Sequence, residues 1–153
     1  TQLEVIDGNG RTLGYRRYPT SHEAIISAMR RYSPLAQPSV IYRKAEILRV
    51  GDYQYTSYVS NEDYELWCRL ATRGAVFANL DEALVRYRIH GGGLKANNVH
   101  KILRGTIAVK RHYWGRAFTV RDRVRLWAEI ALLALPPRLI LWLFFKSQLR
   151  TKL

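Results

Sequence analysis

Two adjacent acids, Glu62 and Asp63, open the segment with the clearest helical pattern in the chain. Apolar residues at helical spacing follow them, and Gly74 marks the expected end of this helix. The N–H groups at a helix start favour negative charge, so a carboxylate there stays ionised, as a general base must be. Acids are also common in first turns for helix stability alone. The spacing by itself therefore leaves a catalytic and a purely structural interpretation open.

Two further segments contain residues that could bind a ligand. His90 follows an expected strand and precedes three glycines, where backbone can approach a ligand and a neutral imidazole can bind a metal or contact a phosphate. A single histidine is, however, more often an ordinary surface or core residue. Arg43 and Lys44 follow a short apolar run, and Gly51 permits an unusual backbone turn. Taken alone, this second segment is typical of a strand, a helix and a helix cap.

The elements that must position these residues alternate between strands and helices. Short alternating or β-branched runs predict strands over residues 3–6, 12–15, 39–42, 76–80 and 84–89. The turn signal Asp7-Gly8-Asn9-Gly10 predicts that the first two form a hairpin. Helical spacing predicts helices over residues 21–31 and 43–50, from Ser60 to Gly74, and from Asn97 or Asn98 to about Trp114. We expect the buried faces of the first and third helices to contain Ile25, Ile26 and Met29, and Tyr64, Leu66, Trp67, Leu70 and Ala71.

Capping signals sharpen these boundaries. Thr20 and Glu23 fit a capping box, with Thr20 as the N-cap and Glu23 at the third helical position. Ser60 is a good N-cap for the next long helix, which would place Asp63 at its third position. Gly51 and Gly74 stand where helices usually end in a left-handed residue. The single cysteine, Cys68, lies within an apolar helical pattern and is expected to be a buried packing residue.

Charge is unevenly distributed along the 153 residues, whose net charge is +13. Residues 104–153 contain eleven Lys or Arg against two acids, whereas residues 1–103 contain fourteen against ten. Because 48% of residues are hydrophobic, the chain can build a core, and its composition disfavours wholesale disorder. A basic block among apolar runs implies an anionic partner, either a phospholipid surface or nucleic acid.

The C-terminal part contains a segment that is long enough to span a membrane but is too often interrupted by charged residues and prolines to do so. Residues 126–145 contain Glu129, two prolines and Arg138, which argues for two amphipathic helices hinged at Pro136 and Pro137 and lying in the membrane interface. The basic residues expected to face lipid headgroups are Arg121, Arg123, Arg125, Arg138, Lys146, Arg150 and Lys152. Those expected to enter the acyl boundary are Trp127, Leu132, Leu133, Leu139, Trp142, Phe144 and Phe145. Packing of these helices on their own domain or on a partner is the alternative.

Four motifs in order give a more specific signal than any single residue. The stretches PSVIYRK (38–44), VGDY (50–53), NEDYELWCRLATRG (61–74) and LVRYRIHGGG (84–93) closely resemble family 2 glycosyltransferases, over about residues 4–94. The resemblance implies an α/β fold, namely the C-terminal, acceptor-side part of a Rossmann-like GT-A domain with a mixed sheet and flanking helices. It divides the chain into a partial GT-A domain (1–95) and a basic helical tail (96–153).

The same resemblance implies roles for individual residues. The family transfers a sugar from a nucleotide-sugar to a glycan or lipid-linked acceptor hydroxyl, usually with inversion. Asp63 would take the proton from that hydroxyl, and Glu62 would orient the acceptor or the loop. Gly51, with Arg43 and Lys44, would form the loop near the acceptor. Two further residues complete the comparison: His90, which would help hold a divalent Mg or Mn ion and the diphosphate, and Val50, where the family usually has a second glycine.

What the chain lacks also follows from the resemblance. It contains no Asp-x-Asp metal motif, so the donor site and most metal ligands are expected outside it, and the isolated piece is expected to be inactive. An exposed sheet edge would favour a homo-oligomer. The resemblance predicts a cytoplasmic enzyme, peripheral on the inner membrane face. The alternatives are a basic nucleic-acid-binding protein, disfavoured because the sequence contains no recognised nucleic-acid motif, and a non-catalytic interaction fragment.

Overall fold

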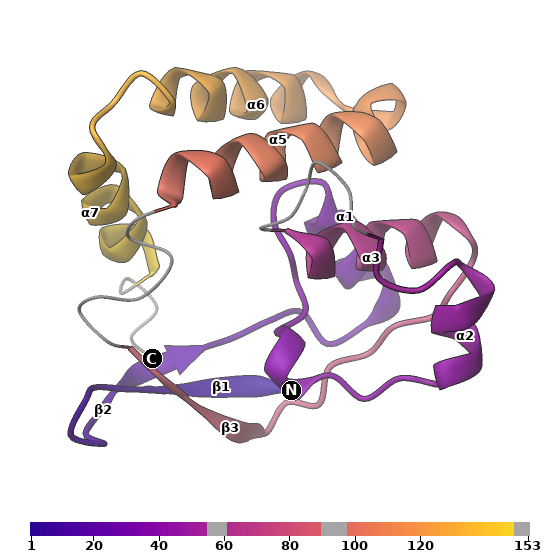
Figure 1. Ribbon diagram of the computed structural model, residues 1–153, viewed down its shortest axis with the longest axis horizontal. Coiled ribbons are helices and arrows are strands. Elements are labelled where there is room, and N and C mark those ends of the chain that lie inside the picture. Colours follow the sequence, from indigo (N-terminus) through magenta and orange to yellow (C-terminus); the bar gives the residue numbers. More distant parts are fainter. Residues whose placement is uncertain (55–60, 90–97, 149–153) are drawn as a thin grey trace.

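The computed structural model describes residues 1–54, 61–89 and 98–148 of the chain, with side chains as far as residue 143. The described chain is an α/β structure with a three-stranded mixed sheet and flanking helices (Figure 1). Its strands are β1 (Gln2–Ile6), β2 (Thr12–Arg16) and β3 (Ala83–Arg88). Its helices are α1 (His22–Met29), α2 (Lys44–Arg49), α3 (Glu62–Thr72), α5 (Val99–Trp114), α6 (Val120–Leu132) and α7 (Pro137–Gln148), with short 3₁₀ turns at Gln37–Ser39 and Gly115–Ala117.

The sheet has the order β2-β1-β3 and confirms the predicted hairpin. Asp7 begins the turn, because its Oδ1 accepts hydrogen bonds of 2.9 Å from the N–H groups of Asn9 and Arg11. Gly10 follows with φ of 86°, a conformation that glycine adopts at little cost. β3 then pairs with β1 in the parallel direction. Parallel pairing requires a long crossover, and here the crossover contains α1, α2 and α3.

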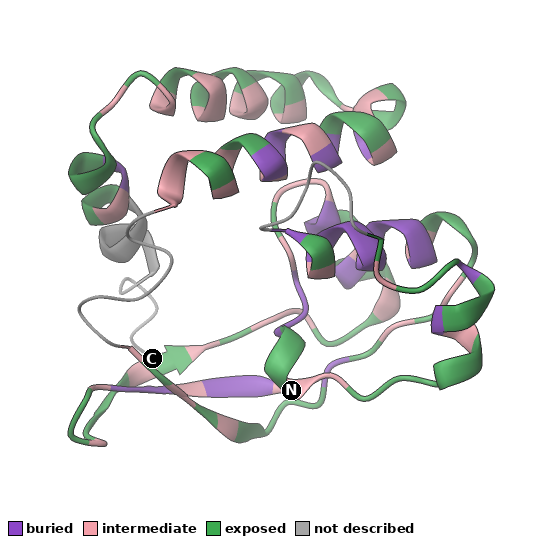
Figure 2. Cartoon of the chain, viewed as in Figure 1, coloured by how far each residue is buried: buried purple, intermediate pink, exposed green. Residues whose placement is uncertain are grey.

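The core is centred on α3, which lies beneath α5 in Figure 1 and is the most continuously buried helix in Figure 2. Residues 64–70 are all buried, so this helix is enclosed on every side, although the sequence pattern predicted one apolar stripe. Side chains from α1, α2 and α5 surround it, and the buried cluster includes Ile25, Met29, Ile47, Trp67, Leu70, Val109 and Trp114. The predicted burial of Cys68 is confirmed.

The strand predicted over residues 39–42 is wrong. Residues Gln37–Ser39 form a 3₁₀ turn with Pro38 near its start, a position that suits the fixed φ of proline. The side chain of Ile41 is 98% exposed, so the apolar run that suggested a buried strand does not enter the core.

The strand predicted over residues 76–80 is also wrong. This segment is irregular, and Val76 is 81% exposed. The buried residue is instead Asn79, whose Nδ2 donates to the carbonyls of Pro19 (2.8 Å) and Pro34 (3.1 Å). The segment therefore anchors two loops and makes no strand ladder. The neighbouring prediction over residues 84–89 is confirmed as β3.

Two predicted helix starts differ by one residue. Ser21, and not Thr20, is the N-cap of α1, because the Ser21 hydroxyl accepts the N–H of Ala24 at 3.3 Å. The N-cap of α3 is Asn61, which makes Asp63 the second helical residue and not the third. Ser60 lies outside the described residues. The end of α3 agrees with prediction, since Gly74 has φ of 81° and donates to Ala71 in a Schellman motif.

Between residues 120 and 148 the structure contains two helices, α6 and α7, as predicted, and the break between them lies at the Pro136–Pro137 pair. α6 runs beside α5, and Lys110 on α5 binds both Glu129 carboxylate oxygens on α6 at 2.7 Å (Figure 1). Because Lys110 is buried, burial lowers the pKa of its ammonium group, while Glu129 opposes that shift. α5 also packs on α3. The domain boundary predicted at residue 95 lies outside the described residues and stays a prediction.

Candidate active site

The start of α3 presents the two acids that the sequence singled out. Glu62 is exposed and Asp63 is half-buried, although the seven residues that follow are buried. Asp63 Oδ1 accepts a hydrogen bond of 2.7 Å from the backbone N–H of Tyr64. The first N–H groups of a helix have no partner within it, so the carboxylate satisfies one of them. The structure thus holds both acids at the positive end of a buried helix, where solvent reaches them.

α5 holds this helix end from the other side. Asn61 turns its side chain away from α3, and its Nδ2 donates to Thr106 Oγ1 on α5 at 3.0 Å. This explains why the N-cap residue makes no side-chain capping bond. Gly105 allows the close approach, because a Cβ at this position would lie 2.3 Å from Asn61 Oδ1. The position of the residue that precedes Glu62 therefore depends on a glycine in another helix.

The Gly51 turn follows α2. Gly51 has φ of 92° and Asp52 φ of 57°, and their N–H groups donate to Leu48 and Ile47 at 3.0 Å in a Schellman motif. Val50, by contrast, has φ of −96° and an 8% exposed side chain in the core cluster. Its backbone does not require glycine. The departure from the family pattern noted at Val50 is thus compatible with the turn.

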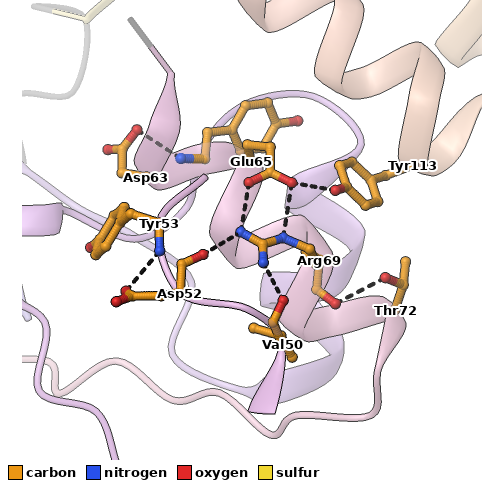
Figure 3. A network of polar contacts seen from close by, with 9 residues as sticks. Val50, Asp52, Tyr53, Asp63, Glu65, Arg69, Thr72 and Tyr113 are labelled. Carbon is orange, nitrogen blue, oxygen red and sulfur yellow. Dashed lines mark hydrogen bonds and ion pairs between the residues drawn. The ribbon is translucent and has the colours of Figure 1, made fainter. Parts of the chain in front are cut away.

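Arg69 ties this turn to α3 (Figure 3). Its guanidinium makes two hydrogen bonds of 3.0 Å to the Glu65 carboxylate, one turn earlier on the same helix. It also donates to the carbonyl of Val50 and, at 2.7 Å, to that of Asp52. The side chains of Arg69 and Glu65 are only 9% and 3% exposed, so this is a buried ion pair whose remaining donors hold backbone.

Tyr113 brings α5 into the same network. Its hydroxyl donates to the Glu65 carboxylate. Burial raises the pKa of the Tyr113 phenol, and the hydrogen bond to Glu65 and the charge of that residue raise it further. The phenol therefore stays protonated and remains a donor over the ordinary pH range. Next to it, Trp114 Nε1 donates to Cys68 Sγ at 3.2 Å, which gives α5 and α3 a second contact.

Tyr53 follows the Gly51 turn and lies within electrostatic range of the acids. Its backbone N–H donates to Asp52 Oδ1 at 2.7 Å. Burial raises the pKa of the Tyr53 phenol, and the nearby charges of Asp63 and Glu62 add to the rise. Figure 3 shows Asp63 and Tyr53 on the same side of the network. The structure therefore brings together the turn and the helix start that the sequence placed ten residues apart.

The structure does not place the remaining predicted site residues beside the acids of α3 and the Gly51 turn. Arg43 and Lys44 are exposed at the start of α2, and no contact joins either to the acids within the described ranges. His90 lies outside those ranges. In the part of the chain that the structure describes, no group of three or more His, Cys, Asp or Glu side chains could hold a metal ion. The described residues therefore provide no fit for the divalent metal, whose ligands the resemblance places mostly outside this chain.

Sequence reasoning missed Glu65, Arg69 and Tyr113. A signal for the first two was present, since an acid four residues before an arginine is the spacing at which helical side chains pair. That spacing usually indicates a solvent-exposed pair, and burial of this one depends on elements far away in the sequence. For Tyr113 we find no local signal.

Curated proteins similar to this chain are glycosyltransferases. An uncharacterised glycosyltransferase of Haemophilus influenzae is 34% identical over 80 residues, which are 52% of this chain and 28% of the relative. The amylovoran biosynthesis glycosyltransferase AmsE of Erwinia amylovora is 34% identical over 73 residues, 48% of this chain and 27% of the relative.

A longer match is to an Escherichia coli protein, the UDP-Gal:alpha-D-GlcNAc-diphosphoundecaprenol beta-1,3-galactosyltransferase. It is 28% identical over 112 residues, 73% of this chain and 40% of the relative. The chain thus spans well under half the length of these relatives. No family model matches it, and no solved structure matches it. The similarity relates the chain to glycosyltransferases in general and does not extend to a particular family or fold type.

Proposed function

We propose that this chain forms the acceptor side of a glycosyltransferase that moves a sugar from a nucleotide-sugar to an acceptor hydroxyl with inversion. The acceptor oxygen bonds to the anomeric carbon while the bond from that carbon to the nucleotide diphosphate breaks, and the diphosphate keeps the electron pair. Asp63 takes the proton that the hydroxyl loses, as a general base. Glu62, exposed beside it, orients the acceptor.

The observation that carries this proposal is the position of Asp63. It lies half-exposed at the start of a buried helix, on the same side of the polar network as Tyr53 (Figure 3). A general base needs a fixed position and an ionised form, and the N–H groups of the first turn favour both. Similarity to glycosyltransferases supplies the class of reaction.

The finer features of the proposal come from the sequence resemblance. They are family 2 membership, a GT-A fold whose donor-binding half lies outside this chain, and a divalent Mg or Mn ion that His90 helps to hold. The Escherichia coli relative is named for UDP-Gal and a diphosphoundecaprenol-linked sugar. By extension, we propose a nucleotide-sugar donor and a glycan or lipid-linked acceptor here. Asp63 and Glu62 act on the acceptor whichever sugar the donor carries.

The test is Asp63→Asn in the full-length protein, assayed with UDP-galactose and UDP-glucose on GlcNAc-diphosphate-lipid acceptors. Loss of the base should lower kcat by about 10²–10⁴-fold, while nucleotide-sugar binding stays unchanged. Glu23→Gln is a matched control, because Glu23 is also an acid in a first turn but belongs to α1. Undiminished turnover in Asp63→Asn would overturn the proposal.

We further propose that α6 and α7 seat the enzyme on the inner face of the cytoplasmic membrane. Trp127 and Trp142 are 71% and 55% exposed, and Arg121 and Arg138 are also exposed on the same two helices. Arg125 is half-buried beside the Lys110–Glu129 pair, so it contributes less to this surface. Lys146 lies in α7, in the part where side chains are not described.

A helix that crosses the bilayer is not part of this proposal. Within residues 1–54, 61–89 and 98–148, no helix combines the length and hydrophobicity that a membrane span requires. Flotation with anionic vesicles tests the proposed attachment. Recovery with phosphatidylglycerol vesicles but not with neutral ones is expected, and failure to float with either removes the attachment from the proposal.

A further inference from the structure

A hollow of about 350 Å³ is lined by residues from the end of α5, from the turn that follows it and from α6. In Figure 1, α6 lies on the opposite side of α5 from α3. Its apolar lining comes from Phe118, Leu126, Trp127 and Ile130. Arg111 and Arg123 complete it from the two helices, and both are exposed. The volume falls within the range of about 300–1,000 Å³ that is common for small-molecule sites.

Among the residues that the structure describes, no salt bridge joins either arginine to a carboxylate. The whole segment from residue 104 to 153 contains two acids, Asp122 and Glu129, and both have other partners. Asp122 accepts from the N–H and hydroxyl of Thr119, at 3.0 and 2.8 Å. Glu129 binds the buried Lys110. The hollow therefore combines two cationic side chains with an apolar wall, which is the chemistry of a site for an anionic amphiphile.

The surroundings of the hollow indicate where such a ligand comes from. Val120, Val124 and Trp127 are 80%, 65% and 71% exposed, and their spacing places them on one face of α6. Trp127 belongs both to this face and to the hollow. An exposed aromatic at such a boundary is typical of proteins that rest at a membrane interface. The apolar face thus leads from the proposed membrane surface to the two arginines.

We propose that this hollow binds one anionic phospholipid, with its phosphate on Arg111 and Arg123 and one acyl chain against Phe118, Leu126 and Ile130. Guanidinium groups suit phosphate because they donate two parallel hydrogen bonds. The site deepens the proposed membrane attachment, on which it rests, and does not involve Asp63 or the sugar-transfer step. It turns a diffuse electrostatic contact into recognition of a single lipid.

Tryptophan quenching tests the site in the full-length protein carrying Trp142→Phe. In that background Trp127 is the exposed tryptophan of the described region, because Trp67 and Trp114 are buried. Two vesicle samples contain equal parts of phosphatidylglycerol and phosphatidylcholine, with bromine on the acyl chains of one lipid or of the other. The two vesicle samples carry the same total charge. Stronger quenching by brominated phosphatidylglycerol than by brominated phosphatidylcholine therefore shows that phosphatidylglycerol is the preferred lipid beside Trp127.

Arg111→Gln/Arg123→Gln should abolish this preference. Arg116→Gln/Arg121→Gln is the matched control, since it removes two exposed charges nearby that do not line the hollow. Each pair should weaken vesicle affinity by about 30-fold through surface charge alone, but the control should keep the preference. Circular dichroism of both variants checks that α5 and α6 remain folded.

Several outcomes would overturn the site. Equal quenching by the two brominated lipids, or a preference that survives Arg111→Gln/Arg123→Gln, would leave only diffuse attraction. Displacement of the lipid by low concentrations of inorganic phosphate would mean that the free anion is the ligand. Binding of an RNA oligonucleotide through the same two arginines, without lipid, would assign the site to nucleic acid. Failure to bind any vesicle would remove the membrane attachment as well.

Discussion

Arg69 on α3 donates a hydrogen bond of 2.7 Å to the backbone carbonyl of Asp52, so the helix that presents Asp63 also holds the turn beside it. Asp52 has a positive φ of 57°, which non-glycine residues adopt only when their surroundings enforce it. The bond from Arg69 is part of that enforcement. In the proposed reaction Arg69 is a positioning residue, because it contacts the turn and not the reacting atoms.

Arg69→Met should lower the free energy of unfolding by about 3–5 kcal/mol, because it leaves the Glu65 carboxylate buried without its cation. Glu65→Leu/Arg69→Met should recover part of that loss, since an apolar pair removes the buried charge. Turnover should be low in both variants, because in both the carbonyls of the Gly51 turn lack the hydrogen bonds that the Arg69 guanidinium donates. Urea unfolding and kcat measure the two effects separately. Normal kcat in the double variant would show that the turn does not need Arg69.

Gly105→Ala should damage the site from the α5 side. The new methyl group would lie 2.3 Å from Asn61 Oδ1, so α5 or the start of α3 must move. Overpacking of this kind costs about 1–3 kcal/mol. Gly115→Ala is a control, because a Cβ there has no neighbour within 4 Å. Thermal unfolding checks the stability loss, and a fall in kcat below that of the control checks the displacement of Glu62 and Asp63. Equal unfolding temperatures and equal kcat values for the two variants would contradict the close contact between α5 and the start of α3.

The Cys68 thiol should resist alkylation in the folded protein. Burial raises its pKa to about 12, so the reactive thiolate is scarce at pH 8 and becomes available only when the chain opens. Reaction with iodoacetamide should therefore be slow without denaturant and fast in guanidinium. Cys68→Ala/Ser27→Cys, with its thiol at an exposed position of α1, should react quickly in both conditions. Rapid native labelling of Cys68 would mean that the α3–α5 contact opens readily.

The capping box of α6 should make part of the stability depend on pH. Hydrogen bonds from Thr119 hold the pKa of Asp122 below its usual value, first through the backbone N–H and then through the hydroxyl. A lowered folded pKa means that this contribution is present above the unfolded value of 3.8 and is lost as pH falls through the folded pKa. Asp122→Ala should therefore destabilise the protein at pH 7, and this effect should shrink as the pH falls through the folded pKa of Asp122.

Urea midpoints of wild type and Asp122→Ala between pH 2 and 7 measure this dependence. Thr119→Ala should cost about 1 kcal/mol at pH 7 by loss of the N-cap. Glu23→Ala is a suitable control, because Glu23 lies in a first turn without a capping box. If the difference in urea midpoint between wild type and Asp122→Ala stays constant with pH, the titration of Asp122 is not the cause of that difference.

The sequence by itself determined the features whose signals are local. The Asp7–Gly10 turn, the glycines that end α2 and α3, and the proline pair between α6 and α7 each act on the few residues around them. The acids at the start of α3 were found for the same reason. Errors of one residue at Ser21 and Asn61 reflect competition between adjacent capping residues, which neighbouring elements decide.

Only the tertiary structure decided those features that depend on residues far apart in the sequence, namely which segments form strands and which polar pairs are buried. Residues 39–42 and 76–80 have strand-like composition, but a strand needs a neighbour with open hydrogen-bonding groups. Here Gln37–Ser39 forms a 3₁₀ turn instead, and Asn79 binds the carbonyls of two loops. Likewise the Glu65–Arg69 pair is buried because Tyr113 and the Gly51 turn close over it. Local spacing can propose such a pair, whereas its burial is set by segments up to 48 residues away.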